Sequence, residues 1–365
     1  MTADTFFDHQ SPESATKTDI VANFFPAWLN IIGRTARGSL AYMELFAGPG
    51  KYADGTKSTP ILVLESILAS PHSSRFRVVL NEMKSRAADL LEANVKALPG
   101  IDRLREPPII RREEIDREKA ISFLHYLDNF PAVLFVDPFG YKGVSRQLFA
   151  QFMRGGWGRD AILFFNYKRI NAALSNPEFT EHMEAIFGAD RAATLWDTLA
   201  PLQSEEREQH VHAALEEAFH EAGVNFIQRY DFEKRHDSLV FMSQSEKGLR
   251  VMKTVMQKRS RSDDDGVPSF SFARPAPRQM NLQLFGPQRS QLDDLRDSLL
   301  TAFDGRTVTF EELVREHHPG TRYVDRNYRQ VLLEMESRSE ITTSPSKRRT
   351  GTFGPNVKIT FPRKG

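Results

Sequence analysis

The stretch "SLAYMELFAGPG", residues 39–50, decides how the first part of this sequence is interpreted. It begins as an apolar run that contains Glu44 and ends in small residues, among them Gly48 and Gly50. Glycine adopts backbone conformations that are closed to other residues, so such a turn lets the main chain approach a ligand. In open parallel sheets, ligands bind beyond the carboxyl ends of the strands. The stretch therefore predicts either a binding loop for a nucleotide-like cofactor or a plain turn between a strand and a helix.

Short apolar runs continue outward from this stretch and alternate with segments whose apolar residues recur at helical spacing. Strands are expected at 39–46, 75–82, 107–113, 131–140, 160–167, 224–232 and 238–245. Helices are expected at 59–69, 83–98, 116–127, 145–154 and about 176–222. This alternation favours an α/β fold with a doubly wound, mostly parallel sheet, whose last two strands could form an antiparallel edge hairpin.

The composition changes after residue 258, which indicates a second domain. Residues 259–287 are rich in Ser, Pro, Gly and charge blocks, and we interpret them as a linker. It separates an α/β domain, 15–258, from a smaller domain, 288–362. Helices are expected there at 289–303, 309–317 and 321–339, followed by two strands within 341–361. This order is typical of a winged helix-turn-helix domain.

Bulk composition excludes several classes of site. The 365 residues are 40% apolar and 27% charged, with a formal net charge of +1, so any attraction to nucleic acid must be local. No cysteine is present, which excludes disulfides, thiolate metal sites and cysteine nucleophiles. The ten histidines show no metal-ligand spacing, so no metal is expected. No apolar run of about 18 residues and no signal pattern occurs, and a cytoplasmic protein is expected.

The loop at 44–50 does not match the patterns that cradle phosphates. The dinucleotide fingerprint and the P-loop are both absent, which favours a cofactor without phosphates, such as S-adenosylmethionine. Glu82 ends the second expected strand, where a carboxylate can accept both ribose hydroxyls. Glu113 follows the third strand and, like Glu114 and Asp116, could approach the adenine amino group. The predicted cofactor-binding residues are Glu44, Phe46, Ala47, Gly48, Gly50, Glu82 and Glu113.

The sequence "VDPFG", residues 136–140, supplies candidate catalytic residues after the fourth expected strand. Methyltransferases that act on exocyclic amino groups often carry Asp/Asn-Pro-Pro-Tyr/Phe at this place. Here Asp137, Pro138 and Phe139 are the predicted catalytic set: the carboxylate accepts from the amine and the ring stacks on a flipped base. The second proline of the pattern is replaced by the aromatic residue. Cytosine C5 methylation needs a cysteine nucleophile, so an amino group of a base is the predicted target.

The order of "ELFAGPG", "NEMKS" and "VDPFG" resembles class I S-adenosylmethionine-dependent methyltransferases. More narrowly, the chain resembles the bacterial three-Cys-motif partner proteins (TcmP), with "KGL" at 247–249 as a further motif. The resemblance covers roughly 15–258 and 289–362. It implies a Rossmann-like sheet of seven strands, an S-adenosylmethionine site at Glu44, Gly48, Gly50 and Glu82, and a partner protein with a three-cysteine motif of the radical S-adenosylmethionine type.

A basic patch marks the smaller domain. In 321–365 there are ten Lys or Arg and four Asp or Glu, so the local net charge is 10 − 4 = +6. A winged helix commonly places its third helix in the major groove of DNA and its wing on the backbone. The predicted nucleic-acid-binding residues are Arg322, Arg326, Asn327, Arg329, Lys347, Arg348 and Arg349. The substrate of a methyltransferase delivered in this way would be DNA or RNA.

Plainer interpretations stay open for each of these features. The acidic residues near 113 are expected to be a solvated loop rather than ligands, and Lys17 is expected to be a surface lysine. Winged helices also mediate protein contacts. A non-catalytic, nucleic-acid-binding partner of a radical enzyme in a mobile-element or phage-defence system is the alternative function, and a transcription regulator that senses a small ligand is a third.

Overall fold

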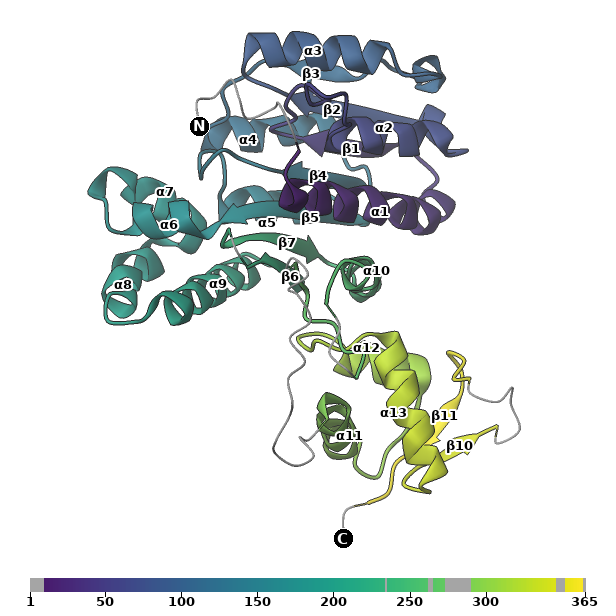
Figure 1. Cartoon of the computed structure of the whole chain (residues 1–365). Coiled ribbons are helices and arrows are strands. Elements are labelled where there is room, and N and C mark those ends of the chain that lie inside the picture. Colours follow the sequence, from purple (N-terminus) through teal and green to yellow (C-terminus); the bar gives the residue numbers. More distant parts are fainter. Residues whose placement is uncertain (1–9, 234, 262–264, 273–289, 346–351, 364–365) are drawn as a thin grey trace. The chain divides into compact units, whose positions relative to one another are not determined.

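The computed structural model describes residues 10–233, 235–261, 265–272, 290–345 and 352–363 (Figure 1). The chain divides into two compact units, Met1–Val255 and Met256–Gly365. Each unit has its own cluster of buried apolar side chains. The expected linker, 259–287, falls largely outside the described residues, so its boundaries stay a prediction.

The first unit is built on a mostly parallel sheet. Its strands are β1 Leu40–Glu44, β2 Phe76–Asn81, β3 Ile109–Arg111, β4 Ala132–Val136, β5 Arg159–Asn166, β6 Phe226–Phe232 and β7 Asp237–Ser243. Their order is β3-β2-β1-β4-β5-β7-β6. Strands β1 to β5 are parallel, whereas β7 is antiparallel to both β5 and β6. The predicted doubly wound, mostly parallel sheet and its antiparallel hairpin are confirmed, but the sheet has eight strands instead of the seven that the resemblance implies, because the short β8, Ser271–Phe272, is its last member. The order reverses between β1 and β4, and ligands bind at such switch points.

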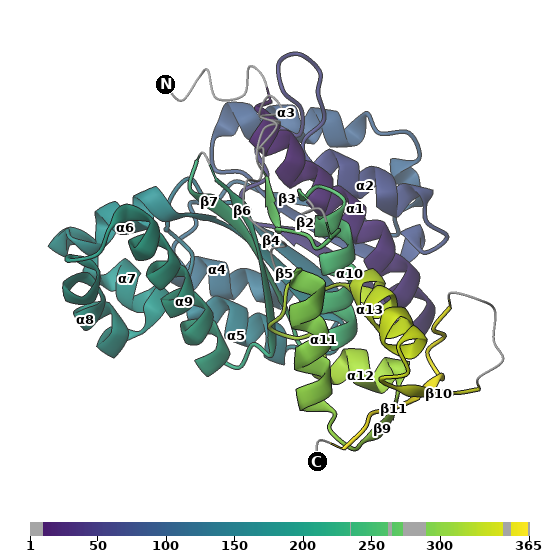
Figure 2. The same cartoon turned by 60° about the horizontal axis from the view of Figure 1, so that its bottom comes forward.

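Helices cover both faces of this sheet. They are α1 Pro12–Thr35, α2 Thr59–Ala69, α3 Ser85–Lys96, α4 Arg117–Phe123, α5 Arg146–Arg154, α6 Tyr167–Leu174, α7 Thr180–Phe187, α8 Ala189–Leu199, α9 Ser204–Glu221 and α10 Glu246–Gln257. Single 3₁₀ turns lie at Ser73–Arg75, Ile101–Arg103, Leu124–Leu127 and Pro177–Phe179. Figure 2 shows α1 and α2 on one side of the sheet and α4 and α5 on the other.

Helix α1 is an element that the sequence analysis does not assign. Pro26 lies inside it and obscures the helical pattern, because proline normally ends a helix. The helix forms because its buried face packs on the sheet: the Phe25 ring lies 5.5 Å from Tyr42 and 5.9 Å from Phe76. Arg75 then closes its C-terminal end by donating to the carbonyls of Gly33, Ala36 and Gly38. This packing fixes the N-terminal turns of α1 beside the switch point.

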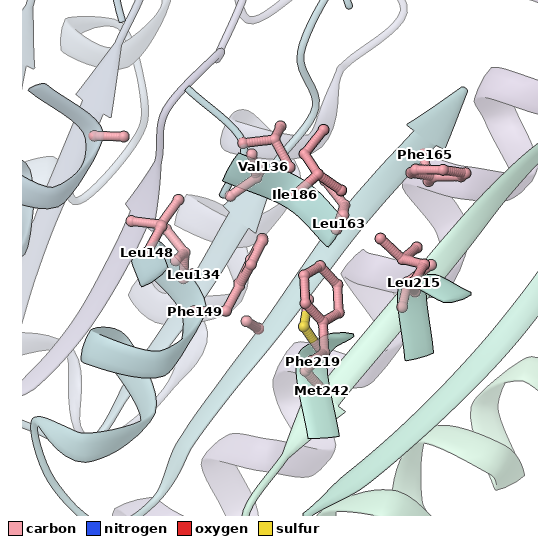
Figure 3. Close-up of a cluster of buried hydrophobic side chains, with 14 of the residues drawn as sticks. Leu134, Val136, Leu148, Phe149, Leu163, Phe165, Ile186, Leu215, Phe219 and Met242 are labelled. Atoms are coloured by element: carbon pink, nitrogen blue, oxygen red, sulfur yellow. The ribbon is translucent and has the colours of Figure 1, made fainter. Parts of the chain in front are cut away.

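The opposite face of the sheet carries the main apolar core (Figure 3). Leu134 and Leu163, on adjacent strands, meet Phe149 of α5 and Phe219 of α9. The Phe149 and Phe219 ring centroids are 5.1 Å apart. Burying an apolar side chain of this size contributes roughly 1.5–3 kcal/mol. The core thus anchors β4 and β5, whose carboxyl ends carry the candidate site.

Arg159, at the start of β5, is buried and binds three backbone carbonyls. Its side chain donates from Nε to the Phe130 carbonyl at 3.1 Å, from Nη1 to the Phe152 carbonyl at 2.9 Å, and from Nη2 to the Asp128 carbonyl. Burial lowers the pKa of this guanidinium. Gly155 leaves room for it, because a Cβ there would lie 1.9 Å from Nη1. One side chain therefore joins the loop before β4, the end of α5 and β5.

The second unit is a winged helix-turn-helix fold, as predicted. Its winged helix consists of α11 Gln291–Ala302, β9 Thr307–Thr309, α12 Phe310–His317, α13 Asp325–Ser337, β10 Thr342–Ser344 and β11 Lys358–Thr360. The wing is a three-stranded antiparallel sheet, β10-β11-β9. The sequence analysis misses β9, because three residues are too few to show a period. Its helix at 321–339 also starts too early, since α13 begins at Asp325.

Part of the expected linker belongs to this fold. Val267 lies in the core of the second unit. Asp265 accepts hydrogen bonds from the Ser290 hydroxyl at 2.7 Å and from the Gln291 amide at 3.0 Å, at the start of α11. The carbonyl of Gly266 accepts from the Arg326 guanidinium. Residues 265–267 are therefore structural parts of the winged helix.

Candidate cofactor and substrate site

The loop after β1 is held in shape by its glycines and by Glu82. Gly48 and Gly50 have φ values of +65° and +82°, which side-chain-bearing residues rarely adopt. A Cβ on Gly50 would lie 3.1 Å from Ile61 and 3.2 Å from Leu91, so this glycine permits close packing. It lines neither of the hollows described below. The Gly48 amide instead donates to Glu82 Oε2 at 3.0 Å.

Glu82 joins the loops that follow β1 and β2. Its side chain is almost completely buried, and its other oxygen, Oε1, accepts from the Lys84 amide at 2.8 Å. A carboxylate has about four acceptor positions, and the two backbone bonds use two of them. The remaining lone pairs are available to the hydroxyls of a ligand.

Asn81, which the sequence analysis does not single out, connects three loops. Its Nδ2 donates to the carbonyls of Leu45 at 3.1 Å and Glu113 at 3.0 Å, and its Oδ1 accepts from the Glu113 amide at 3.0 Å. The Glu113 carboxylate is paired with Lys119 at 3.1 Å. Glu113, the residue predicted to contact adenine, therefore has its negative charge balanced by Lys119. The sequence feature that could have identified Asn81 is its position beside Glu82 at the end of β2.

A hollow of about 770 Å³ lies over the carboxyl ends of β1, β2 and β4. It is lined by Leu45, Phe46, Asn81, Glu82, Met83, Lys84, Glu113, Glu114, Ile115, Pro138, Phe139, Gly140, Tyr141, Lys142, Arg169, Ala172, Ala173, Asn176, Phe179 and His182. Its volume lies within the range of small-molecule sites, and its walls are mostly apolar with a few polar groups. We call it the nucleoside hollow, because a carboxylate can accept hydrogen bonds from ribose hydroxyls and aromatic walls can stack on a base.

A second hollow of about 450 Å³ adjoins the first. Phe46, Pro138, Phe139 and Arg169 line both. Its other walls are Ser11, Glu13, Ser14, Lys17, Thr18, Glu44, Ala47, Gly48, Tyr52, Ser58, Thr59, Pro60, Asp137, Phe164, Asn166 and Arg235. We call it the acceptor hollow. Of the predicted cofactor and catalytic residues, the structure gathers all except Gly50 around these two hollows.

Glu44 is buried at the floor of the acceptor hollow. Burial is the main cause that raises its pKa well above the usual range, and the nearby Asp137 and Glu82 carboxylates add to the rise. The Tyr42 hydroxyl, which donates to Glu44 Oε2 at 2.8 Å, and Lys17 act in the opposite direction. A ligand group that carries positive charge would favour the ionised form of this buried carboxyl. The sulfonium and ammonium groups of S-adenosylmethionine are groups of this kind.

Lys17 and Asp137 form an ion pair in the wall of the acceptor hollow. Their side chains are 12% and 24% exposed, so the expectation that Lys17 is a surface lysine is wrong. The Lys17 ammonium also lies 4.5 Å from the centre of the Phe164 ring. The sequence could not place it, because 120 residues separate it from Asp137.

Asp237, a buried carboxylate behind this wall, holds Asn166 and Arg235 of the wall in place. Asp237 Oδ1 accepts from Asn166 Nδ2 at 2.6 Å, and its Oδ2 lies 3.1 Å from Arg235 Nε. Burial raises the pKa of Asp237 to about 6, against the lowering effect of Arg235 and Lys17. Asn166 also accepts from the amide of Arg169 at 2.9 Å and so begins α6. Asn166 and Asp237 were not predicted.

The predicted nucleic-acid-binding residues of the second unit have structural partners of their own. Asn327 is 1% exposed, and its Oδ1 accepts from the Val324 amide at 3.1 Å, which caps α13. Arg322 donates to Gln291 at 3.2 Å, and Arg329 lies over the Phe310 ring at 4.8 Å. Arg326 binds the Gly266 carbonyl. The wing residues Lys347, Arg348 and Arg349 lie outside the described residues.

A cluster of metal ligands and a membrane-spanning helix are both absent from the described ranges. Histidine and carboxylate side chains there do not gather in a group of three or more that could hold a metal ion. The helices of these ranges include none with the length and apolar character needed to cross a membrane.

Comparison with known proteins supports the assignment of the second unit. A family model described as the GMT-like wHTH domain matches residues 269–348. The C-terminal unit holds a GMT-like winged helix-turn-helix domain. The match covers this GMT-like domain and leaves the larger unit without a family assignment. No curated protein sequence matches the chain.

Solved structures match the chain at low sequence identity. A candidate S-adenosyl-L-methionine-dependent methyltransferase of Methanococcus maripaludis is 13% identical, with a TM-score of 0.30, over 64% of this chain and 91% of that one. A candidate rRNA methylase of Clostridium thermocellum is 14% identical, with a TM-score of 0.32, over 60% and 97%. The fold assignment rests on the strand order given above.

Proposed function

We propose that this protein is an S-adenosylmethionine-dependent methyltransferase that acts on nucleic acid. The observation that carries the proposal is the pair of adjoining hollows at the switch point of the sheet, with Glu82 bound to the Gly48 amide between the first two strand ends. One hollow offers a carboxylate and aromatic walls, and the other offers buried charges. A cofactor and an acceptor can therefore meet at the shared residues.

The residues have distinct roles in this proposal. S-adenosylmethionine, when bound, supplies a methyl group made electrophilic by its sulfonium sulfur. Glu82 accepts the ribose hydroxyls, and Glu44 faces the positively charged end of the ligand. Phe139, which lines both hollows, orients the acceptor toward the shared wall. Alignment of this kind is a large part of what an enzyme contributes to a transfer between two substrates.

The winged helix supports nucleic acid as the substrate class. Such domains commonly bind nucleic acid through a helix and the wing. Arg338 and Lys358 are exposed on the second unit. Basic residues on a nearly neutral chain bind phosphates through local charge. The unit would hold the substrate while the first unit performs the transfer.

Calorimetry and label transfer test this function together. We expect saturable binding of S-adenosylmethionine to the full-length protein and transfer of a labelled methyl group to RNA or DNA. Absence of binding at millimolar cofactor would reject the proposal. Binding without transfer to either nucleic acid would favour the non-catalytic partner instead.

Glu44 predicts that cofactor binding depends on pH. The free protein has a raised Glu44 pKa, so the proton is held at pH values where a carboxyl is normally ionised. A cationic ligand favours the ionised form, so binding should release this proton and strengthen as pH rises through the raised pKa. Calorimetry in two buffers with different ionisation enthalpies measures the release. Glu44→Gln should remove the difference between buffers, and an unchanged difference would contradict the assignment.

Membership of a narrower protein family is also a proposal. The motifs "FAGPG", "DPFG" and "KGL" support membership of the TcmP family, and through that resemblance a radical S-adenosylmethionine partner with a three-cysteine motif. A cytoplasmic location agrees with this role. The sequence predicts the amino group of a base as the acceptor, from Asp137 and the likeness of "DPFG" to the amino-methyltransferase motif, but the contact between Lys17 and Asp137 favours a hydroxyl acceptor.

A further inference from the structure

Among the polar groups that line the acceptor hollow, Lys17 and Asp137 place a hydrogen-bond donor directly beside an acceptor. Lys17 presents an ammonium, which can only donate hydrogen bonds, and Asp137 presents a carboxylate, which can only accept them. The two are in direct contact, and both line the hollow. Asp137 Oδ2 is the oxygen that meets Lys17, which leaves Oδ1 for a ligand. A ligand group that fills this position must both donate and accept.

A hydroxyl group matches this pair, whereas an exocyclic amino group does not. A hydroxyl donates its proton to Asp137, accepts from Lys17 through one lone pair, and keeps a second lone pair for attack. An exocyclic amine has two N–H donors and one lone pair, and that lone pair must attack. The Lys17 ammonium would then face a donor or occupy the nucleophilic lone pair, and an unmatched polar group in a half-buried site costs about 1–3 kcal/mol.

The surroundings hold Lys17 in this orientation. Phe164 lies under the ammonium at 4.5 Å, and the Glu44 carboxyl contributes to the same field. Lys17 lies on α1, whose N-terminal turns are fixed by Ser11 and by the bond between Ser14 Oγ and Tyr52 Oη at 2.9 Å. The ammonium is therefore a fixed part of the hollow wall. Groups placed in advance where charge develops stabilise a transition state without reorganisation.

We propose that the methyl acceptor is a hydroxyl oxygen, and that the substrate is RNA methylated on a ribose 2′-hydroxyl. The inference rests on the proposed function, which limits the substrate to nucleic acid. Internal nucleotides of DNA have no free hydroxyl, whereas every internal nucleotide of RNA has one that can donate and accept. The donor and acceptor pair thus selects RNA as well as the atom.

The groups present account for each bond and for the proton in this transfer. The acceptor oxygen forms a bond to the methyl carbon as the carbon–sulfur bond of the donor breaks, and the electron pair of that bond stays on sulfur. The hydroxyl proton passes to Asp137 and then to water. Lys17 stabilises the negative charge that develops on the oxygen before the new bond is complete. Both residues touch the reacting hydroxyl, so both are catalytic in this proposal.

Arg169 supplies an anchor for the neighbouring phosphate. It is exposed, lines both hollows, and within the described part of the chain its guanidinium makes no ion pair or hydrogen bond. Asn166 fixes the first turn of α6, which carries it. A ribose 2′-hydroxyl is adjacent to a phosphodiester, which a guanidinium binds with two hydrogen bonds. Loss of this contact should raise KM for RNA about tenfold with kcat unchanged.

The test uses the full-length protein, labelled S-adenosylmethionine, and matched pools of unmodified transcribed RNA and of DNA with the same sequences. We expect label only in RNA, in 2′-O-methylnucleosides after digestion, and in dinucleotides that resist alkali. Lys17→Met and Asp137→Asn should each reduce transfer about 10²-fold or more. Calorimetry should show cofactor affinity close to that of the unchanged protein in both. Lys57→Met, at an exposed ion pair with Glu65 outside both hollows, is the matched control.

The outcomes separate this inference from the function on which it rests. Label in methylated bases, equal label in DNA, or bound cofactor with no transfer to RNA would overturn the hydroxyl acceptor. Failure to bind cofactor at all would overturn the proposed function itself. If Lys17→Met unfolds, Lys17→Arg keeps the charge and the fold but moves the donors, and should lower kcat more than it raises KM. Full activity in Lys17→Arg and Lys17→Met together would also overturn the role of Lys17.

Discussion

Glu82→Ala should abolish measurable binding of S-adenosylmethionine. Glu82 is 5% exposed, and its two oxygens accept from the amides of Gly48 at 3.0 Å and Lys84 at 2.8 Å. Alanine removes the acceptor proposed for the ribose hydroxyls and also releases the loop after β1. Each hydrogen bond to a charged group contributes about 1.5–3 kcal/mol, so two ribose bonds correspond to a loss of about 10²–10⁴-fold in affinity. Calorimetry at millimolar ligand measures this loss.

Glu92→Ala is the matched control for this change. Glu92 lies on α3, the helix that follows Glu82, but its carboxylate is exposed and paired with Lys96 and Arg112. Exposed pairs contribute about 0–1 kcal/mol, so this variant should bind like the unchanged protein. Circular dichroism of Glu82→Ala shows whether the fold is retained. A folded Glu82→Ala protein with normal affinity would remove Glu82 from the site.

Arg159→Met should destabilise the first unit by about 3 kcal/mol or more. Arg159 is 3% exposed and donates to the carbonyls of Asp128, Phe130 and Phe152. Methionine keeps much of the apolar stem but leaves these carbonyls without their donors, and each buried unsatisfied group costs about 1–3 kcal/mol. No single helix or strand can compensate, because the carbonyls come from separate segments.

Urea unfolding followed by tryptophan fluorescence isolates this effect. The chain has three tryptophans, Trp28, Trp157 and Trp196, and all lie in the first unit, so the signal excludes the winged helix. A lower midpoint with an unchanged slope reports lost stability. Arg154→Met, at an exposed position at the end of α5, should leave the midpoint unchanged. Equal midpoints for Arg159→Met and the unchanged protein would show that the three bonds contribute little.

The parts of the fold that the sequence predicted are those decided by local pattern. Strands buried on both faces appear as apolar runs, so β1, β2, β4 and β5 were found within a few residues. Glu82 and Asp137 were found as candidates because each follows such a strand directly. Position at a strand end is a local property, and parallel strands bring their ends to one edge.

Residues that join the site across long distances in the chain could not be predicted in this way. Lys17 meets Asp137 only because α1 packs on the sheet, and Asn166 meets Asp237 only because β7 pairs with β5. Asn327 has a structural role that its residue type alone could not show. Its residue type suggested base recognition, but the start of α13 needed a cap, and the side chain is used there.

The contacts of Asn81 and Glu82 have a consequence for how a ligand would enter. These hydrogen bonds within the protein tie the loops after β1, β2 and β3 to one another and use no ligand atom as a partner. A ligand therefore does not have to order these segments, so little of its interaction energy is lost to conformational entropy. The heat-capacity change of association should then reflect only the ligand surface that is buried. Association should also proceed in one kinetic step, without a slower phase from loop closure.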